Sequence, residues 1–531
     1  MPKTYEKEIT IKNWHRGMSD VDLDDYSLDG QASYIQSADL IESKPFLRPG
    51  YDPSDDVTGL ITNSGVGRVR GYAHKNTGAG SFKLACVDYA DATDTGGAER
   101  INVFTRTDYD DNWVSQDTDA SAGIGTAEPV EGCEFYDDNE LYFASKDSNN
   151  DITIGQYLDA TTIINVSWDT LNTSAWGGTS GRLRRILKHT DGNLYFLKGV
   201  GDKGYLGPYD GTSKPSTITP ATLPVGYEPV DAISYGNKIL VACNSTSGGK
   251  SALAIRDPYS ALVYTFDDIY YLEIFKINAI RRVAGRIIII TSDFDYKLWE
   301  WLGGENVVER KKLKVGSSSI GYIRPQAVDV RDNTLYFGTN ALVTGFNGGV
   351  YAFGFNPDGS TFLHNAFLDH TDDVSNVSWR AFKFWDDATD TGFVATARDG
   401  TTATHRNMKM KIGATRSAAL QWDSTWMRPF PNLRSQIIKA TLYHEDPAAA
   451  GTITFASKSD TTDAASYTTN FVANVNGSYN TVVGNNAVLR GAITGSVTAF
   501  TSGRKHKIRI TMTNGAQLEK IKLRCRTTEQ I

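Results

Sequence analysis

The chain has 531 residues, of which 40% are hydrophobic, 22% are charged and 11% are aromatic, with a formal net charge of −8. This composition is typical of a folded protein of about two to four domains and excludes a predominantly disordered chain. No run approaches the roughly 18 apolar residues of a membrane-spanning helix, and the N-terminus lacks the apolar core of a signal peptide. We therefore expect a soluble protein made in a cytoplasm.

The four cysteines and the charges indicate little chemistry by themselves. The cysteines share no short spacing, which favours small buried side chains over a zinc cluster or a disulfide framework. Residues 1–60 contain 6 Lys and Arg against 12 Asp and Glu, whereas residues 430–531 contain 12 against 6. These opposed ends favour head-to-tail contacts between copies of the chain or with neighbouring proteins, and a solvated surface of uneven charge explains them equally well.

Residues 1–60 are predicted to form an extended N-terminal arm. One short apolar alternation, Ile9 to Ile11, is followed by about forty residues with little periodic pattern. Apolar side chains such as Trp14, Phe46 and Leu47 are still more numerous than a solvating tail needs. The arm should therefore become ordered by lying across the rest of the chain or across a neighbouring subunit.

Residues 61–428 contain a repeat of an apolar strand, a tight polar turn and a second apolar strand. The second strands begin at Leu84, Leu141, Leu194, Ile239, Ile287, Leu335 and Phe393. Asp, Asn and Gly in the turns supply the positive φ angles of tight hairpins, and a third strand follows most copies. Seven copies at this spacing predict a β-propeller of about seven blades, in which Glu8–Lys12 adds a strand to the last blade.

Residues 429–531 are predicted to form a C-terminal β-sandwich, similar to a jelly roll. Pro429 and Pro431 mark the boundary, and strands that alternate at period two are expected at 437–445, 451–459, 481–491, 505–514 and 518–527. The last two strands should form a hairpin around Asn514 and Gly515. The fold class is therefore all-β, with a propeller, a sandwich and an N-terminal arm.

Candidate chemical sites are weak throughout the chain. Asp-rich turns at 108–113, 147–151 and 292–296 resemble calcium ligands only in composition. A sugar-stacking platform could be formed by Trp299, Trp301, Trp379 and Trp385, but aromatic residues at strand positions are more often core residues. Phosphate could be bound by the basic segments 182–188, 309–314 and 504–509, which alternating strands with one solvated face explain equally well. Histidine metal motifs, a nucleophile elbow and a phosphate loop are missing. We therefore predict no catalytic residue, no metal, no cofactor and no enzymatic activity.

The order of features at residues 10–50 resembles the opening of tail nozzle and related β-propeller proteins of tailed bacteriophages. A short strand ends in Asn, a Gly-x-Ser turn follows, and a polar segment leads into an S-x-P-x-L-x-P phrase. The matching residues are Ile11, Asn13, Gly17, Ser19, Gln31, Ser43, Pro45, Leu47 and Pro49. The chain departs from the nozzle of short-tailed phages in its smaller size and its compact terminal sandwich, which leaves its position in the tail open.

The resemblance implies a structural protein of the virion tail. It implies a homo-oligomeric ring, with a hexamer favoured, that contacts an adaptor or tail fibres and lets DNA pass during ejection without specific binding. An assembly arm would then include Trp14, Gly17, Ser19, Gln31, Pro45, Phe46 and Leu47. The main alternative is a receptor- or glycan-binding protein at the tail tip, and a glycan-cleaving propeller is a third.

Overall fold

The computed structural model is built almost entirely of strands. It describes residues 5–14, 18, 32–36, 38–40, 47–49, 54–55, 69–76, 82–90, 100–107, 113–119, 132–137, 139–146, 151–159, 163–260, 264–315, 321–340, 348–367, 377–386, 391–399, 405–412, 419–430, 433–445, 451–460, 467–475, 490–494, 502–513 and 516–527. Among these residues the helical elements are short 3₁₀ turns: η2 (Ser174–Trp176), η3 (Pro215–Thr217) and η4 (Pro325–Ala327). Within the described residues, no helix is long and apolar enough to cross a membrane. The all-β prediction is confirmed.

The chain divides into two compact units, which are described separately. The first comprises Met1–Asp52, Gly349–Leu368 and Gly413–Ile531, and the second comprises Pro53–Gly348 and Asp369–Ile412. This division differs from the domain boundaries predicted from the sequence, which lie after residues 60 and 428. The N-terminal segment is grouped with the C-terminal strands instead of standing alone.

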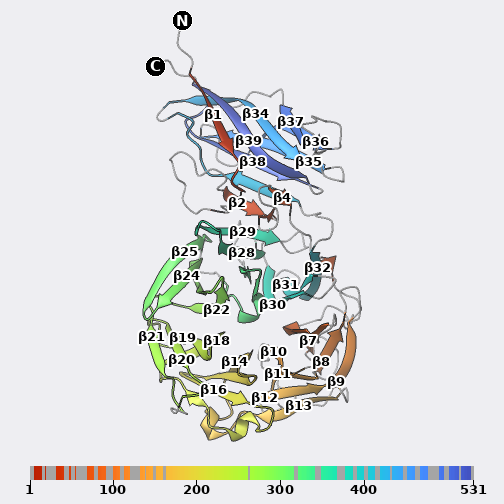
Figure 1. Cartoon of the computed structure of the whole chain (residues 1–531), viewed down its shortest axis with the longest axis vertical. Coiled ribbons are helices and arrows are strands. Elements are labelled where there is room, and N and C mark those ends of the chain that lie inside the picture. Colours follow the sequence, from red (N-terminus) through yellow and green to blue (C-terminus); the bar gives the residue numbers. More distant parts are fainter. Residues whose placement is uncertain are drawn as a thin grey trace. The chain divides into compact units, whose positions relative to one another are not determined.

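Seven four-stranded antiparallel sheets form the β-propeller (Figure 1). In hydrogen-bonding order they are β6 (Val69–Asn76), β7 (Phe82–Ala90), β8 (Arg100–Arg106) and β9 (Val114–Asp119); β10 (Cys133–Phe135), β11 (Glu140–Lys146), β12 (Ile152–Leu158) and β13 (Ile163–Thr170); β14 (Arg182–Lys188), β15 (Leu194–Val200), β16 (Lys203–Tyr209) and β17 (Ala221–Thr222); β18 (Tyr227–Tyr235), β19 (Lys238–Ser245), β20 (Ala252–Arg256) and β21 (Asp268–Tyr271); β22 (Ile277–Val283), β23 (Arg286–Asp293), β24 (Asp295–Gly303) and β25 (Asn306–Leu313); β26 (Val328–Arg331), β27 (Thr334–Gly338), β28 (Val350–Phe355) and β29 (Thr361–Phe367); and β30 (Val377–Asp386), β31 (Thr391–Asp399), β32 (His405–Ile412) and β5 (Ser54–Asp55).

The sequence repeat corresponds to these sheets. Every one of the seven predicted second strands is present, as β7, β11, β15, β19, β23, β27 and β31. The positive φ angles expected in the polar turns are present. Asp332 and Asn333, between β26 and β27, have φ values of 48° and 58°. Such a two-residue turn matches the twist of the strands that it joins.

The first strands of the seven propeller sheets all lie in the second unit and form a closed ring. The first strand of each sheet contacts the first strand of the next, and β30 of the last sheet contacts β6 of the first. Gly71 allows a close approach, because a Cβ there would lie 2.8 Å from the backbone nitrogen of Cys133 on β10. The strand that completes the last sheet is β5, which pairs with β32. The prediction that Glu8–Lys12 does so is wrong.

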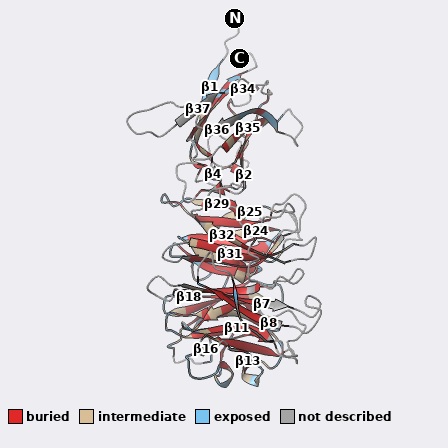
Figure 2. Ribbon diagram, turned by 90° about the vertical axis from the view of Figure 1, so that its right-hand side faces the viewer, coloured by how far each residue is buried: buried red, intermediate tan, exposed pale blue. Residues whose placement is uncertain are grey.

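Apolar clusters lie between neighbouring sheets of the propeller. One cluster joins the sheet of β14 to that of β18 through residues such as Leu197 and Val241, and another joins the last sheet to the first through Trp385 and Phe104. Since most sheets are covered on both faces, their strands are largely buried, as Figure 2 shows. This explains why β strands such as Arg286–Asp293 have continuous apolar runs rather than alternation.

The first unit contains a β-sandwich of two sheets. One has the order β1 (Glu6–Ile11), β39 (Gln517–Thr527), β34 (Ser435–Glu445) and β37 (Arg490–Thr494). The other has the order β2 (Ala32–Gln36), β33 (Leu420–Ser424), β38 (His506–Met512), β35 (Gly451–Ser459) and β36 (Thr468–Val475), and β3 (Ala38–Asp39) pairs with β4 (Arg48–Pro49). Alternate residues of β38 are buried, which fits a sheet with one covered face.

Two expectations about the sandwich are corrected. Strands β38 and β39 belong to different sheets, so the predicted hairpin between them is wrong, although Asn514 and Gly515 themselves lie outside the described residues. Strand β33 belongs to the sandwich although it precedes Pro429. Period-two alternation identifies a strand but does not identify its partner.

The opposed charges of the two chain ends meet within the first unit. Strand β1 pairs antiparallel with β39, and the Glu6 carboxylate contacts both Arg524 and Arg526. The Glu8 carboxylate lies 3.0 Å from Lys522 Nζ. Complementary charge therefore joins the first strand of the chain to its own last strand, whereas contacts between copies stay a prediction.

Candidate functional site

The first strands of the propeller sheets provide the candidate site. In five of them, β6, β14, β18, β22 and β30, the pairing with the second strand shifts by one residue. The residues passed over are Arg70, Arg184, Val230, Asn278 and Arg380. A bulge of this kind bends the strand and changes the direction of nearby side chains.

Six consecutive first strands each carry a charged residue, and the signs alternate. The set is Glu134 on β10, Arg185 on β14, Asp231 on β18, Arg281 on β22, Asp329 on β26 and Lys383 on β30. We call these six residues the charge ring. Three carboxylates and three cations leave it without net charge.

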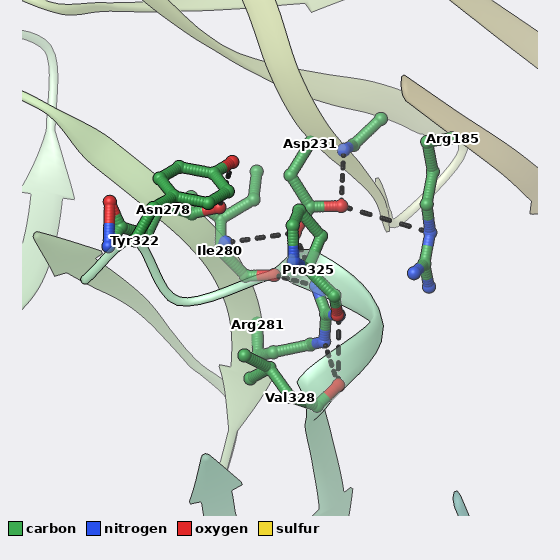
Figure 3. Close-up of polar contacts among 9 residues, drawn as sticks. Arg185, Asp231, Asn278, Ile280, Arg281, Tyr322, Pro325 and Val328 are labelled. Carbon is green, nitrogen blue, oxygen red and sulfur yellow. Dashed lines mark hydrogen bonds and ion pairs between the residues drawn. The ribbon is translucent and has the colours of Figure 1, made fainter. Parts of the chain in front are cut away.

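Asp231 is the most buried member of the charge ring. Its carboxylate forms an ion pair with Arg281 and lies 3.8 Å from Arg185 Nε. It also accepts hydrogen bonds from the backbone nitrogens of Ala232 at 2.9 Å and Ile280 at 3.1 Å. Figure 3 shows the carboxylate between the two guanidinium groups. One side chain therefore joins three neighbouring sheets.

Arg281 continues the network towards the next sheet. Its Nε and Nη2 atoms donate to the Val328 carbonyl at 3.1 and 2.9 Å, and Nη2 also donates to the Pro325 carbonyl. Burial lowers the pKa of Arg281, and the Asp231 carboxylate opposes this shift. Because the guanidinium is buried and donates hydrogen bonds to groups of neighbouring sheets, it links those sheets.

Asp329 repeats the arrangement of Asp231 two sheets further on. Its carboxylate lies 3.4 Å from Lys383 Nζ and accepts a hydrogen bond from the Phe384 backbone nitrogen at 3.0 Å. In both cases an aspartate on one first strand binds the backbone of a neighbouring first strand beside a cation. The repeat of sheets therefore carries a repeat of polar contacts.

Glu134 lies between basic members of the charge ring. Burial raises the pKa of its carboxyl group, and the charges of Lys383 and Arg185 oppose that rise. The remaining first strand, β6, provides an uncharged link, because the Tyr72 hydroxyl lies 2.7 Å from Thr396 Oγ1 on β31. Polar contacts thus accompany apolar packing around the ring of sheets.

The contacts of the charge ring indicate a role in holding neighbouring sheets together. Asp231 and Asp329 are each held by a cation and a backbone donor. In the part of the chain that the structure describes, no group of three or more His, Cys, Asp and Glu could hold a metal ion. The geometry supports a ring of sheets that resists deformation.

Sequence reasoning did not identify the charge ring, although a signal was present. Six of the seven first strands carry a member of the charge ring, and several of these residues lie between apolar neighbours, as in Val230-Asp231-Ala232 and Phe382-Lys383-Phe384. A single such residue is uninformative, because strands with a solvated face contain many charges. Its recurrence in six consecutive first strands, with alternating sign, is the informative pattern.

The structure describes two of the seven predicted arm residues. Trp14 is buried, its indole nitrogen donates to the Glu519 carbonyl at 2.9 Å, and its ring meets Trp422 edge to face at 5.1 Å. Leu47 is also buried, and its backbone pairs with Leu518. Both belong to the core of their own unit, which accounts for them without a neighbouring subunit. Gly17, Ser19, Gln31, Pro45 and Phe46 lie outside the described residues.

Other sequence candidates have structural roles. Asp293 pairs with Lys276, and Asp295 lies 3.1 Å from Lys312 and accepts a hydrogen bond from the Val315 nitrogen. Trp301, Trp379 and Trp385 are buried, whereas Trp299 is partly exposed. The four cysteines are buried and form no disulfide.

Comparisons with known proteins concern the fold. No protein-family model and no curated protein matches the chain. Among solved structures, it is similar to an exo-β-1,3-galactanase from Phanerochaete chrysosporium with β-1,3-galactotriose, at 11% identity over 89% of this chain and 99% of that chain, with a TM-score of 0.31. It is similar to the Dos1 propeller at 12% identity over 68% and 95% (TM-score 0.38), and to Sqt1 from Chaetomium thermophilum at 9% over 68% and 99% (TM-score 0.41).

These comparisons correct one expectation. The lack of recognisable catalytic motifs led to the prediction that the chain is not an enzyme. Structures to which it is similar include glycoside hydrolases, which overturns that prediction. At these identities the likeness assigns no activity to this chain.

Proposed function

We propose that the chain is a structural component of the tail of a tailed bacteriophage, in which copies of the propeller assemble as a ring around the path of the DNA. The observation that carries the proposal is the presence, in one chain, of the residue pattern of tail nozzle proteins at 10–50 and a seven-sheet β-propeller. A hexamer is the ring that the resemblance favours. An adaptor or tail fibres would be its neighbours in the virion.

Two physical features support a conduit. The charge ring and the clusters between sheets tie each propeller into a unit that resists deformation, as a channel wall under load requires. The formal net charge of −8 disfavours adhesion to DNA phosphates, so DNA would pass without being retained.

Cryo-electron microscopy of the source particle tests the proposal directly. We expect density for the propeller and the sandwich in the tail, repeated around its axis. Mass photometry of the purified chain should give either a closed ring or a monomer that assembles only on particles. A chain located outside the tail, or in no virion, would refute the proposal.

A receptor- or glycan-binding tail protein is the second candidate. It is favoured by one surface of the sandwich, where cations and aromatic rings gather on adjacent strands. That surface is a property of the chain whether or not the chain belongs to a tail.

A further inference from the structure

The outer face of the sheet β2-β33-β38-β35-β36 carries an unusual group of side chains. In β38 the alternate residues Ile508, Ile510 and Met512 are buried in the sandwich core, so Lys507 and Arg509 lie on the opposite face. Strand β35 pairs with β38, and its Lys458 is directly opposite Lys507. Three cations from two adjacent strands therefore share this face.

Two aromatic rings lie among these cations. Lys458 Nζ is 4.7 Å from the ring centroid of Tyr467 and 5.8 Å from that of Trp426. Lys507 Nζ is 5.2 Å from the Trp426 centroid, and Arg509 Cζ is 4.1 Å from that of Tyr467. We call these five partly buried residues the basic aromatic surface.

Arg509 is held in one orientation within this surface. Its Nε and Nη2 atoms each donate to the Asp423 carboxylate on β33 at 2.7 Å, which is a bidentate pair. Asp423 therefore fixes the position of one of the three cations. The two lysines border the same Trp426 ring and are the groups best placed to meet a ligand.

Lys458 and Lys507 bring two like charges directly opposite each other on adjacent strands. Like charges directly opposite each other across two strands destabilise a sheet. Nearby rings reduce this cost through cation–π contacts, which also hold the ammonium groups at the surface.

We propose that the basic aromatic surface binds an acidic polysaccharide, with the anionic group of one sugar between Lys458 and Lys507. The ammonium groups would form charge-assisted hydrogen bonds with a carboxylate or sulfate, and the apolar face of a sugar ring would pack against Trp426. Cations lie over Tyr467 at 4.1 and 4.7 Å, so this ring is less open to a nucleobase. This favours an acidic sugar chain over single-stranded nucleic acid.

Binding of the full chain to immobilised polysaccharides tests the proposal. The probes are polygalacturonate for carboxylates, dextran sulfate for sulfates, neutral dextran, and an oligo-thymidylate. We expect binding to at least one acidic polysaccharide, weakening with salt, and none to dextran. The double variant Lys458→Gln and Lys507→Gln should lose about tenfold or more in affinity, as expected when two charge-assisted contacts are removed.

The double variant Lys520→Gln and Lys522→Gln is the matched control, because it removes the same charge from the other sheet, where Lys520 Nζ also lies over a ring, that of Tyr443. It should bind acidic polysaccharides almost as the parent does. Thermal unfolding of both variants shows that they fold. Equal loss in both variants, equal binding to dextran, preference for the oligonucleotide, or no binding to either acidic polysaccharide would overturn the inference. None of these outcomes bears on whether the chain is found in a virion tail.

Discussion

The propeller and the sandwich place their charged residues differently. Within the propeller, Asp231 and Arg281 are buried at the meeting of three sheets, with hydrogen bonds to backbone groups. Within the sandwich, Glu6 pairs with Arg524 and Arg526 on an edge strand, where water reaches all three side chains. The same ion-pair chemistry thus occurs in two very different surroundings.

The difference teaches that burial decides what an ion pair contributes. A buried charge whose partner is removed cannot recover its hydration, so the loss costs several kcal/mol. An exposed pair exchanges its partner for water, and salt screens it further. Removing one partner of a buried pair in the charge ring should therefore destabilise the propeller strongly, whereas removing a partner from the pairs of β1 should mainly influence local fraying.

Replacing Asp231 by Ala should have the largest effect. It would leave the buried Arg281 guanidinium without its carboxylate and should reduce the free energy of unfolding of the propeller by about 3–5 kcal/mol. Urea unfolding followed by tryptophan fluorescence measures this change. Asp202→Ala, an exposed position, is the control and should change stability by less than about 0.5 kcal/mol.

The double variant Asp231→Val and Arg281→Met sharpens this test. Removing both charges should restore part of the stability lost in Asp231→Ala, because no unpaired charge is then buried. The single variants Asp231→Val and Arg281→Met provide the comparison. A double variant whose loss of unfolding free energy exceeds the sum of the losses in the two single variants would contradict a direct favourable coupling between the residues.

Trp14→Ala should destabilise the sandwich without changing the propeller. The substitution removes a large buried side chain and should cost about 3–5 kcal/mol. Hydrogen exchange should therefore rise in β34 and β39 but not in β18 or β22. Tyr259→Ala removes an aromatic ring that is 72% exposed and serves as the control. A variant that exchanges as slowly as the parent would contradict the core position of Trp14.

Ala284→Gly should make a smaller, stabilising change in the propeller. Ala284 and Gly285 form the turn between β22 and β23 with φ values of 48° and 80°. A left-handed conformation costs a residue with a Cβ about 1–2 kcal/mol, which Gly avoids, although Gly also loses more entropy on folding. We expect a net gain of about 0.5–1 kcal/mol in urea unfolding. Gly285→Ala is the reverse control and should destabilise.

Glu6→Gln should have the smallest effect. The hydrogen bond from Arg526 lowers the pKa of Glu6, so its contribution is present above the pKa of the unfolded chain and is lost as pH falls through the lower folded value. Hydrogen exchange of β1 should therefore rise in the variant at neutral pH and in the parent at acid pH, with little global change. Exchange that is independent of both pH and the substitution would contradict a role for the pair.

Much of the propeller could be predicted from the sequence. Each sheet is built from strands close together in the chain and joined by short turns, as at Asp332 and Asn333, so local signals specify both strands and partners. The exception is β5, which pairs with β32 across more than three hundred residues. Turn residues and periodicity, which act over a few neighbouring residues, do not predict such a pairing.

The sandwich was less predictable for the same reason. Its neighbours in space, such as β1 and β39 or β2 and β33, come from opposite ends of the chain. Alternation located β35, β38 and β39 but not their partners, which led to a false hairpin. Part of the opposed charge of the two ends pairs within one chain, where Glu6 and Glu8 meet β39, and head-to-tail contacts between copies stay a prediction.

The sequence by itself determined the all-β class, the seven repeats of the propeller and the alternating strands of the sandwich, because periodicity and turn residues act over a few neighbours. Only the tertiary structure decided where the N-terminal strand lies, how the ring closes and which charges meet. Those features depend on contacts such as Asp231 with Arg281, between residues far apart in the chain. Their stability comes from burial, which arises only when the sheets are packed together.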